Sequence, residues 1–171
     1  MQEITSSDWR IIRNVFRSGF ASSFHFGVAS INDDGSPHLT PIGSLVFSDM
    51  GRGIYFEEYP RTLTHNLKRD QRICVMALNA SKWTFFRTML RGKAAGPFGV
   101  RLYGTAGERR EATPEEVTRF LRRVRPFRFL RGHRLLWGKL RTVRDVRFHA
   151  FEPVRIPQLG SAQWPAHAQG S

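Results

Sequence analysis

The sequence predicts a mainly β protein with some α-helix, built as a small antiparallel β-barrel with two to three flanking helices. Three observations predict this α+β class. Five or six short runs are either continuously apolar or alternate apolar and polar residues, as strands do. Turn residues separate these runs, and at most three segments have helical spacing. Strands and helices do not alternate regularly, which argues against a doubly wound parallel sheet.

Two segments have the start signals of an amphipathic helix. Ser7 is expected to cap the first helix, which ends near Gly19. Thr113 is expected to cap the second, where Pro114 takes the first helical position and Glu116 completes a capping box. Both helices carry apolar residues at helical spacing: Trp9, Ile12 and Phe16 in the first, and Val117, Phe120, Leu121 and Val124 in the second.

Between these helices the expected strands begin with a hairpin. Residues 24–31 and 38–47 flank Asp34-Gly35, a dipeptide typical of tight hairpin turns. Pro41 lies in the second strand and has no N–H to donate to a neighbour, which indicates a sheet edge, a bulge or a ligand contact. The remaining strands are expected at residues 54–57, 72–78, 99–108 and 143–156, the last with Val146, Phe148 and Ala150 on one face.

Two further segments complete the expected fold. Residues 60–70 predict a short helix with Leu63 and Leu67 on one face. Residues 82–95 have no clear pattern and are expected to form a strand edge or an irregular loop. We expect one domain over residues 1–157 and a flexible tail over residues 158–171, because that tail is small, polar and unpatterned.

Composition narrows the class of protein. The chain has 171 residues, with 27 Lys and Arg against 14 Asp and Glu, a formal net charge of +13. No run approaches the roughly 18 apolar residues of a membrane span, and the N-terminus does not have the pattern of a secretory signal, so we expect a cytoplasmic protein. Its single cysteine, Cys74, excludes an internal disulfide, and no histidine pair has metal-ligand spacing, so no metal is expected.

The order of the elements, with HxTPI at residues 38–42, IYF at 54–56 and NLxxDxR at 66–72, resembles the flavin-binding split-barrel family related to pyridoxamine 5′-phosphate oxidase. The resemblance implies a homodimer that binds FMN at the subunit interface. The ring would lie along the second hairpin strand and the phosphate at the start of the short helix, where free N–H groups favour an anion. The residues implied to bind the cofactor are Thr40, Pro41, Ile42, Tyr55, Arg61, Thr62, Asn66 and Arg101.

One position departs from the family pattern. The family often has Ser-Arg-Lys where this chain has Arg61-Thr62-Leu63, so an apolar residue replaces the lysine. Thr64, Asn66 or Arg101 could compensate for that loss. Asn66 has an alternative role as a brace of the short helix, and Tyr55 as a core residue.

The resemblance implies an FMN-dependent oxidoreductase, a reductase acting on a small molecule, with hydride transfer supplied by the flavin. No catalytic side chain is assigned, because the sequence offers no Ser-His-Asp arrangement and no carboxylate pair. The C-terminal sequence does not match the basic residues with which pyridoxamine phosphate oxidases hold their substrate phosphate. Oxidation of vitamin B6 is therefore not expected.

Residues 117–149 hold eleven Lys and Arg against one acid, and they suggest alternatives. Aromatic residues interleave with the charges, so the segment could bind single-stranded nucleic acid, and residues 127–140 could lie on an anionic membrane surface. We favour a solvated helix face or a dimer interface over nucleic-acid binding. A haem-binding split barrel is a further alternative that no residue selects.

Overall fold

The computed structural model describes residues 1–79, 81–93, 96–127, 138, 140–155, 158 and 164; the side chains of residues 82, 84, 85 and 127 are outside this description. Its eight strands form one antiparallel sheet in the order β3-β2-β6-β7-β8-β5-β4, with β1 added to β8. The strands are β1 (Gln2–Glu3), β2 (Phe26–Ile31), β3 (Pro37–Ile42), β4 (Val46–Phe47), β5 (Arg52–Phe56), β6 (Arg72–Leu78), β7 (Gly99–Glu111) and β8 (Thr142–Val154). The helices are α1 (Ser6–Ser23), α2 (Arg61–Arg69), α3 (Lys82–Arg91) and α4 (Pro114–Val124), which is followed by a 3₁₀ turn at Arg125–Phe127.

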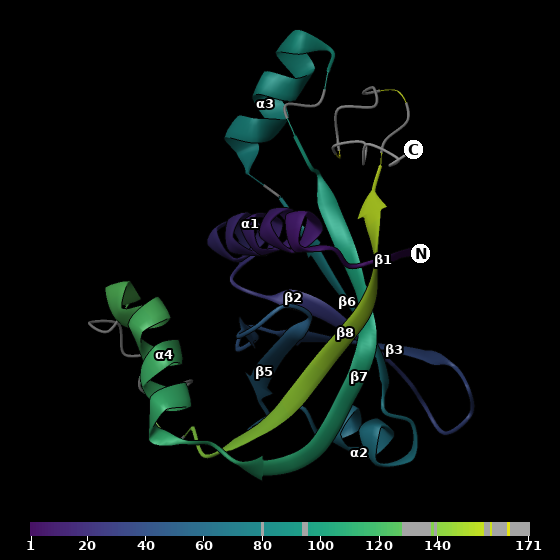
Figure 1. Ribbon diagram of the computed structural model, residues 1–171, viewed down its shortest axis with the longest axis vertical. Coiled ribbons are helices and arrows are strands. Elements are labelled where there is room, and N and C mark those ends of the chain that lie inside the picture. The colour runs from purple at the N-terminus through teal and green to yellow at the C-terminus, as the bar shows by residue number, and fades with distance from the viewer. Residues whose placement is uncertain are drawn as a thin grey trace.

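The predicted α+β fold, a split barrel with flanking helices, is confirmed (Figure 1). The long strands β7 and β8, of 13 residues each, form its centre and curve together away from α3. Their register shifts beside Gly104, where a side-chain carbon would collide with the carbonyl oxygen of Arg147. Glycine is therefore required for the two strands to approach each other at this bend.

Helix α1 packs its apolar face onto the barrel. The expected face is confirmed, since Trp9, Ile12 and Phe16 are all buried. The cap, however, is Thr5 rather than Ser7, because Thr5 and Asp8 exchange the two hydrogen bonds of a capping box. The Phe16 ring lies 4.8 Å from the rings of both Phe26 and Phe47, so α1 is joined to β2 and β4 through aromatic contacts.

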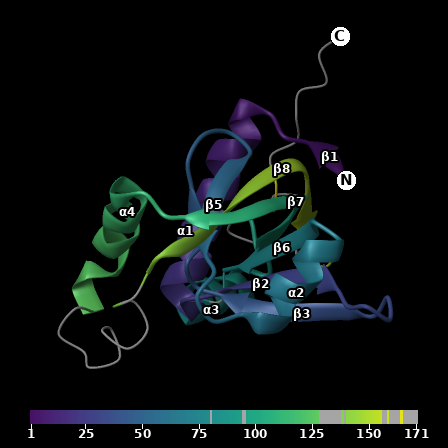
Figure 2. The same ribbon diagram turned by 90° about the horizontal axis from the view of Figure 1, so that it is seen from below.

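Helix α4 forms as the sequence predicts. Thr113 and Glu116 make the capping box, and Phe120 and Val124 are buried. Phe120 contacts Phe56 of β5 with 5.3 Å between ring centres. The two views show α4 standing beside the barrel, on the connection between β7 and β8 (Figure 2).

Helix α3 corrects the expectation of a strand edge or loop over residues 82–95. The large apolar side chains that the structure describes in this helix lie outside the core: Trp83 is 70% exposed and Leu90 is 76% exposed. The helix projects from the end of the barrel opposite α2 (Figure 1). The described side chains of α3 form no buried apolar stripe, which is the pattern by which a core-facing helix is predicted from a sequence.

The expected tail, residues 158–171, falls mostly outside the described residues. Trp164 is described, and it is buried against Phe151 with 5.1 Å between ring centres. Its indole Nε1 donates a hydrogen bond of 3.1 Å to Asp8 Oδ1. This contact joins the C-terminal segment to the first turn of α1.

Among the helices of the described residues, none combines the length and the hydropathy that crossing a bilayer requires.

Candidate cofactor site

Strand β3 carries three of the predicted cofactor residues and lies at one end of the sheet order. Pro41 pairs with Gly27 of β2, and no other described strand pairs with the far side of β3. Of the three explanations for a proline in this strand, the structure supports the sheet edge. The edge leaves backbone N–H and C=O groups of β3 free to meet a ligand or another chain.

Alternation along β3 separates Thr40 and Ile42 from Pro41. Ile42 is buried opposite Phe26, and Thr40 pairs with Val28, so both side chains face the barrel interior. The Thr40 hydroxyl is buried and has no hydrogen-bond partner among the described residues. Pro41 points to the outer face, where it is exposed.

The outer face brings two predicted residues into one row. Directly paired residues share a face, and the pairs run from Pro41 through Gly27 and Met76 to Arg101. Three strand spacings, about 14 Å, separate the two ends of this row. A side-chain carbon at Gly27 would lie 3.2 Å from Leu39 Cδ1, so glycine keeps the surface beside Pro41 shallow.

Arg101 ends this row beside an acidic partner. Its Nη1 lies 3.8 Å from Glu152 Oε1, and both side chains are partly exposed. Tyr103 donates a hydrogen bond of 2.8 Å to the other oxygen of Glu152, and this bond raises the tyrosine pKa to about 12. Cys74 lies near by, and burial raises its thiol pKa, so it stays a neutral thiol.

Arg61 and Thr62 occupy the first two positions of α2, and both are exposed. The N-cap of α2 is Pro60, which offers no side-chain hydrogen bond. Helices α1 and α4, in contrast, have their first N–H groups satisfied by capping boxes. The start of α2 therefore combines open backbone donors, the positive end of a helix dipole and a guanidinium.

A shallow cavity of about 250 Å³ opens at this end of α2. Arg61, His65, Lys68 and Arg109 are the basic residues that line it. Of the two acidic residues in its lining, Glu58 accepts hydrogen bonds from the backbone N–H groups of residues 141 and 142, whereas Glu57 Oε2 lies 3.9 Å from Arg109 Nε. Arg61 and Lys68, which pair with no acid of the described residues, are therefore available for an anion.

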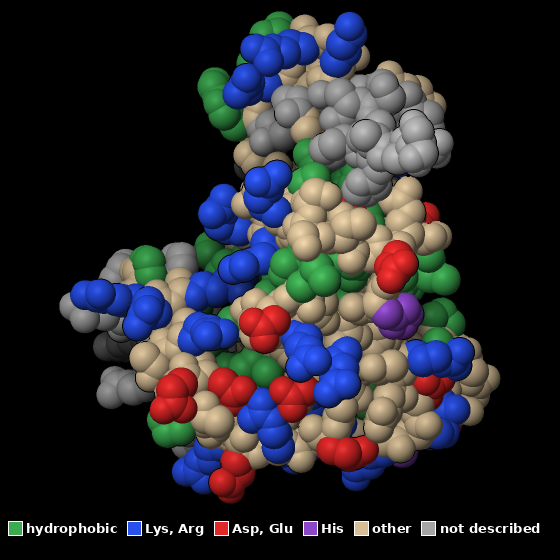
Figure 3. Space-filling view, in the orientation of Figure 1, with side chains coloured by type: hydrophobic (Ala, Val, Ile, Leu, Met, Phe, Trp, Pro, Cys, Tyr) green, Lys and Arg blue, Asp and Glu red, His purple; other side chains and the backbone are tan. Residues whose placement is uncertain are grey.

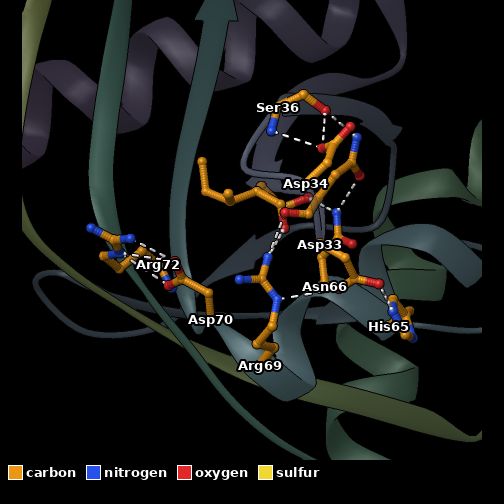
Figure 4. A network of polar contacts seen from close by, with 11 residues as sticks. Asp33, Asp34, Ser36, His65, Asn66, Arg69, Asp70 and Arg72 are labelled. Atoms are coloured by element: carbon orange, nitrogen blue, oxygen red, sulfur yellow. Dashed lines mark hydrogen bonds and ion pairs between the residues drawn. The ribbon is translucent and has the colours of Figure 1, made fainter.

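Asn66 braces α2 against the hairpin, as Figure 4 shows. Its Nδ2 donates to Ser30 Oγ and to Asn32 Oδ1, both at 3.0 Å, and the residue is 1% exposed. Arg69 donates to the carbonyl oxygens of Ile31 and Asn32, at 3.0 and 2.6 Å. The bracing role is therefore visible, while cofactor binding by Asn66 stays a prediction.

The same network holds the hairpin turn. His65 Nε2 lies 2.7 Å from Asp33 Oδ2 and Arg69 Nε lies 3.2 Å from Asp33 Oδ1 (Figure 4). These contacts hold the pKa of Asp33 below its ordinary value, and the hydrogen bond to His65 has the largest effect. They fix the hairpin that carries β3 relative to the helix that carries Arg61.

Tyr55 lies inside the barrel, in a network that the sequence analysis did not identify. Its hydroxyl donates a hydrogen bond of 2.9 Å to Glu57 Oε1, and burial raises its pKa well above the ordinary value. Arg144 Nε donates a hydrogen bond of 2.6 Å to the same oxygen, and Arg144 Nη1 donates one of 2.7 Å to the carbonyl oxygen of Gly107. The sequence contained a signal for this burial. Arg144, Val146 and Phe148 are two residues apart along β8, so the three side chains face the same side, the core.

The structure thus distributes the predicted residues over three places. Pro41 and Arg101 share the outer face, Arg61 and Thr62 lie at the start of α2, and Tyr55 is in the barrel interior. The arginine-rich segment is also divided: residues 128–137 and 139 are outside the described residues, while Arg144 belongs to the core and Arg123 to a cleft. Nucleic-acid binding, membrane contact over residues 127–140 and haem binding stay predictions.

Comparison with known proteins decides the family. Residues 15–146 match the family described as pyridoxamine 5′-phosphate oxidase. The chain belongs to the pyridoxamine 5′-phosphate oxidase family. This confirms the resemblance drawn from the motifs of β3, β5 and α2. No curated protein matches this chain.

Solved structures with a similar fold are distant in sequence from this family member. An FMN-binding protein from Syntrophomonas wolfei has a TM-score of 0.58 at 12% identity, over 88% of this chain and 90% of its own. A conserved hypothetical protein from Mycobacterium tuberculosis has a TM-score of 0.56 at 19% identity, over 100% and 98%. HupZ from Group A Streptococcus has a TM-score of 0.54 at 15% identity, over 95% and 99%. At these identities the similarity supports the fold alone.

Proposed function

We propose that this protein binds FMN, with the phosphate in front of α2 and the flavin ring against β3, and that it acts as a reductase of a small molecule. The observation that carries the proposal is the start of α2, which lacks a side-chain cap and has Arg61, Lys68 and Arg109 around a shallow cavity. Anions bind at such helix ends because the backbone donors and the dipole both favour negative charge. The family match and the similarity to an FMN-binding protein add support.

The residues at α2 fit a phosphate group despite the missing lysine. Arg61 can donate two parallel hydrogen bonds to phosphate oxygens, and the Thr62 hydroxyl can donate a third. Leu63, in the position of the family lysine, is fully buried beneath the helix. Lys68 and Arg109 line the cavity and can supply the positive charge that Leu63 lacks.

The edge strand fits the polar rim of a flavin ring. Because Thr40 and Ile42 point inward, contact at these positions would come from the free backbone groups of β3. Pro41 and Gly27 leave a shallow apolar surface on the outer face beside that edge. Bound flavin supplies hydride transfer, and the residues of the chain orient the ring and exclude water.

A homodimer is part of this proposal. Leu39, on the same outer face, is 63% exposed. A second copy over this face would cover Leu39 and Pro41 and close the ring site from solvent. A flavin held between two copies would thereby be protected from competing reactions.

The test is a titration of FMN fluorescence with the purified protein, alongside its visible absorption spectrum. We expect saturable quenching, because a ring stacked in a protein site loses emission. Riboflavin, which lacks the phosphate, is the matched control ligand and should bind more weakly. A folded protein that leaves FMN fluorescence unchanged at high concentration contradicts the proposal.

A further inference from the structure

A second cavity, of about 640 Å³, lies between α1, the segment around β4 and the end of α4. Its lining includes the aromatic residues Phe16, Phe20 and Phe26, which are almost fully buried and form an apolar floor. No aspartate or glutamate of the described residues lines it. None of the residues predicted to bind FMN lines it either, so this cleft is separate from the proposed flavin site.

Arg123 enters this cleft from α4. Its guanidinium carbon lies 3.5 Å from the centre of the Phe20 ring and 5.7 Å from that of Phe26. Nη1 donates a hydrogen bond of 2.6 Å to the carbonyl oxygen of Leu45. These contacts hold the group in place over the aromatic floor, and its other N–H groups have no hydrogen-bond partner in the part of the chain that the structure describes.

Among the described residues, no carboxylate pairs with Arg123. Burial lowers the pKa of Arg123 to about 10, which is the mark of a cation removed from water without a compensating anion. Arginines that lose water in proteins are ordinarily paired with an acid. Arg123 therefore has no anionic partner among the described residues of this chain.

Three further arginines stand along the same cleft. Arg10, Arg13 and Arg17 are spaced three and four residues apart on α1, which places them on one side of the helix. None of them pairs with an acid of the described residues, and Arg17 donates only to Asn14. Figure 3 shows basic side chains gathered over α1 and toward α4. The cleft therefore has a positive field that attracts anions.

We propose that this cleft binds a small aromatic anion, whose carboxylate, sulfonate or phosphate group pairs with Arg123 and whose ring enters the apolar cleft beside the guanidinium. The volume falls within the range of roughly 300–1000 Å³ typical of small-molecule sites. A single-stranded nucleic acid fits less well, because the rings are buried in the floor and do not stand out as stacking platforms. The site does not depend on flavin binding.

The experiment uses 8-anilinonaphthalene-1-sulfonate, an aromatic anion that fluoresces when bound, and N-phenyl-1-naphthylamine, its neutral analogue. The variant is Arg123→Gln, and Arg122→Gln is the matched control, an exposed neighbour on α4 with the same change of charge. We expect Arg123→Gln to weaken binding of the sulfonate at least about 10-fold, since charge-assisted hydrogen bonds are lost. Arg122→Gln should change it less than about twofold, and the neutral analogue should bind both variants alike.

The proposal is overturned if Arg123→Gln and Arg122→Gln lose equal affinity for the sulfonate. It is also overturned if Arg123→Gln loses equal affinity for the sulfonate and for the neutral probe. A thermal melt checks that Arg123→Gln is folded; if it is not, the double variant Arg13→Gln/Arg17→Gln is measured in its place. That variant should weaken the sulfonate and reduce the salt dependence of its binding, and unchanged binding overturns the proposal.

Two competitors test the nature of the site. Saturating FMN should leave the affinity for the sulfonate unchanged, and competition between them overturns a site distinct from the flavin. Benzoate and phenyl phosphate should displace the probe, whereas displacement only by an oligonucleotide overturns the small-molecule assignment. If the protein proves not to bind FMN, the sulfonate measurements stand unaffected, so the two proposals fail separately.

Discussion

Arg144 is fully and Arg123 partly withdrawn from water, and among the described residues only Arg144 has a carboxylate partner. Arg144 is 2% exposed and its guanidinium meets Glu57 at 2.6 Å inside the barrel. Arg123 lies over Phe20 and donates to a backbone carbonyl, with no acid beside it among the described residues. The first arrangement is a buried ion pair inside the core. The second leaves a cation that an anionic ligand can pair with.

This difference changes the meaning of the basic composition. Both arginines belong to the run of residues 117–149 that raises the net charge, and by composition they are equivalent. The fold assigns one to the interior of β8 and the other to a cleft beside α1. The basic residues of this segment therefore do not form one continuous surface. Only those without an acidic partner indicate where an anionic ligand could bind.

The largest predicted effect comes from breaking the compensated pair. Glu57→Gln leaves Arg144 buried without an opposite charge, and we expect a loss of about 3–5 kcal/mol in the free energy of unfolding. Chemical denaturation measures this loss. Arg109→Gln is the control, because Arg109 is half-exposed and lies 3.9 Å from the same carboxylate, and it should cost less than about 1 kcal/mol. Equal effects of the two variants would contradict a special role for the buried pair.

An intermediate effect is expected at a pair that water partly screens. Arg110 contacts Glu116 at 2.6 Å and Asp145 at 2.8 Å, with about a third of its own side chain exposed. Its hydrogen bonds hold the pKa values of both carboxyl groups below their ordinary values. After allowance for screening, we expect Arg110→Gln to cost about 1 kcal/mol at neutral pH.

The pH dependence of this cost has a definite sign. Because both carboxyl pKa values are lower in the folded protein, their stabilisation is present above the unfolded pKa values and is lost as pH falls through the folded ones. The difference in unfolding free energy between the wild type and Arg110→Gln should shrink below about pH 4. A difference that stays constant down to pH 2 would rule out this ion-pair explanation.

The smallest predicted effect is at the uncompensated arginine. Arg123→Gln removes a charge that has no carboxylate partner, so the lost cation–π contact and hydrogen bond are offset by a lower desolvation cost. We expect the free energy of unfolding to change by less than about 1 kcal/mol, measured by denaturation without ligand. A loss as large as that of Glu57→Gln would mean that Arg123 is a structural residue.

The elements that the sequence predicted well are those whose signals are local. The capping box of α4 and the apolar run of β6 were identified because neighbouring residues determine both. Helix α3 was missed because its exposed Trp83 and Leu90 do not form the buried stripe on which helix prediction relies. The cap of α1 was misplaced by two residues because Thr5 and Ser7 are both good capping residues.

The site was predictable only in part, because its residues are brought together across the sheet. The proline of β3 indicated a sheet edge, a bulge or a ligand contact without deciding between them, and parity along β8 could have indicated that Arg144 is buried. The contact between Glu57 and Arg144, 87 residues apart in the chain, depends on the pairing of β5 with β8. The arrangement of Arg123 over Phe20 depends likewise on how α4 meets α1, which no local pattern encodes.

The most direct test of the central functional claim compares FMN and riboflavin in the wild type and in Arg61→Ala. If the phosphate lies in front of α2, Arg61→Ala should weaken FMN about 10-fold to 100-fold, the loss of charge-assisted hydrogen bonds, and change riboflavin less than about threefold. Arg52→Ala, at an exposed position of β5, should change neither. Equal weakening of FMN and riboflavin by Arg61→Ala would contradict a phosphate site at the start of α2.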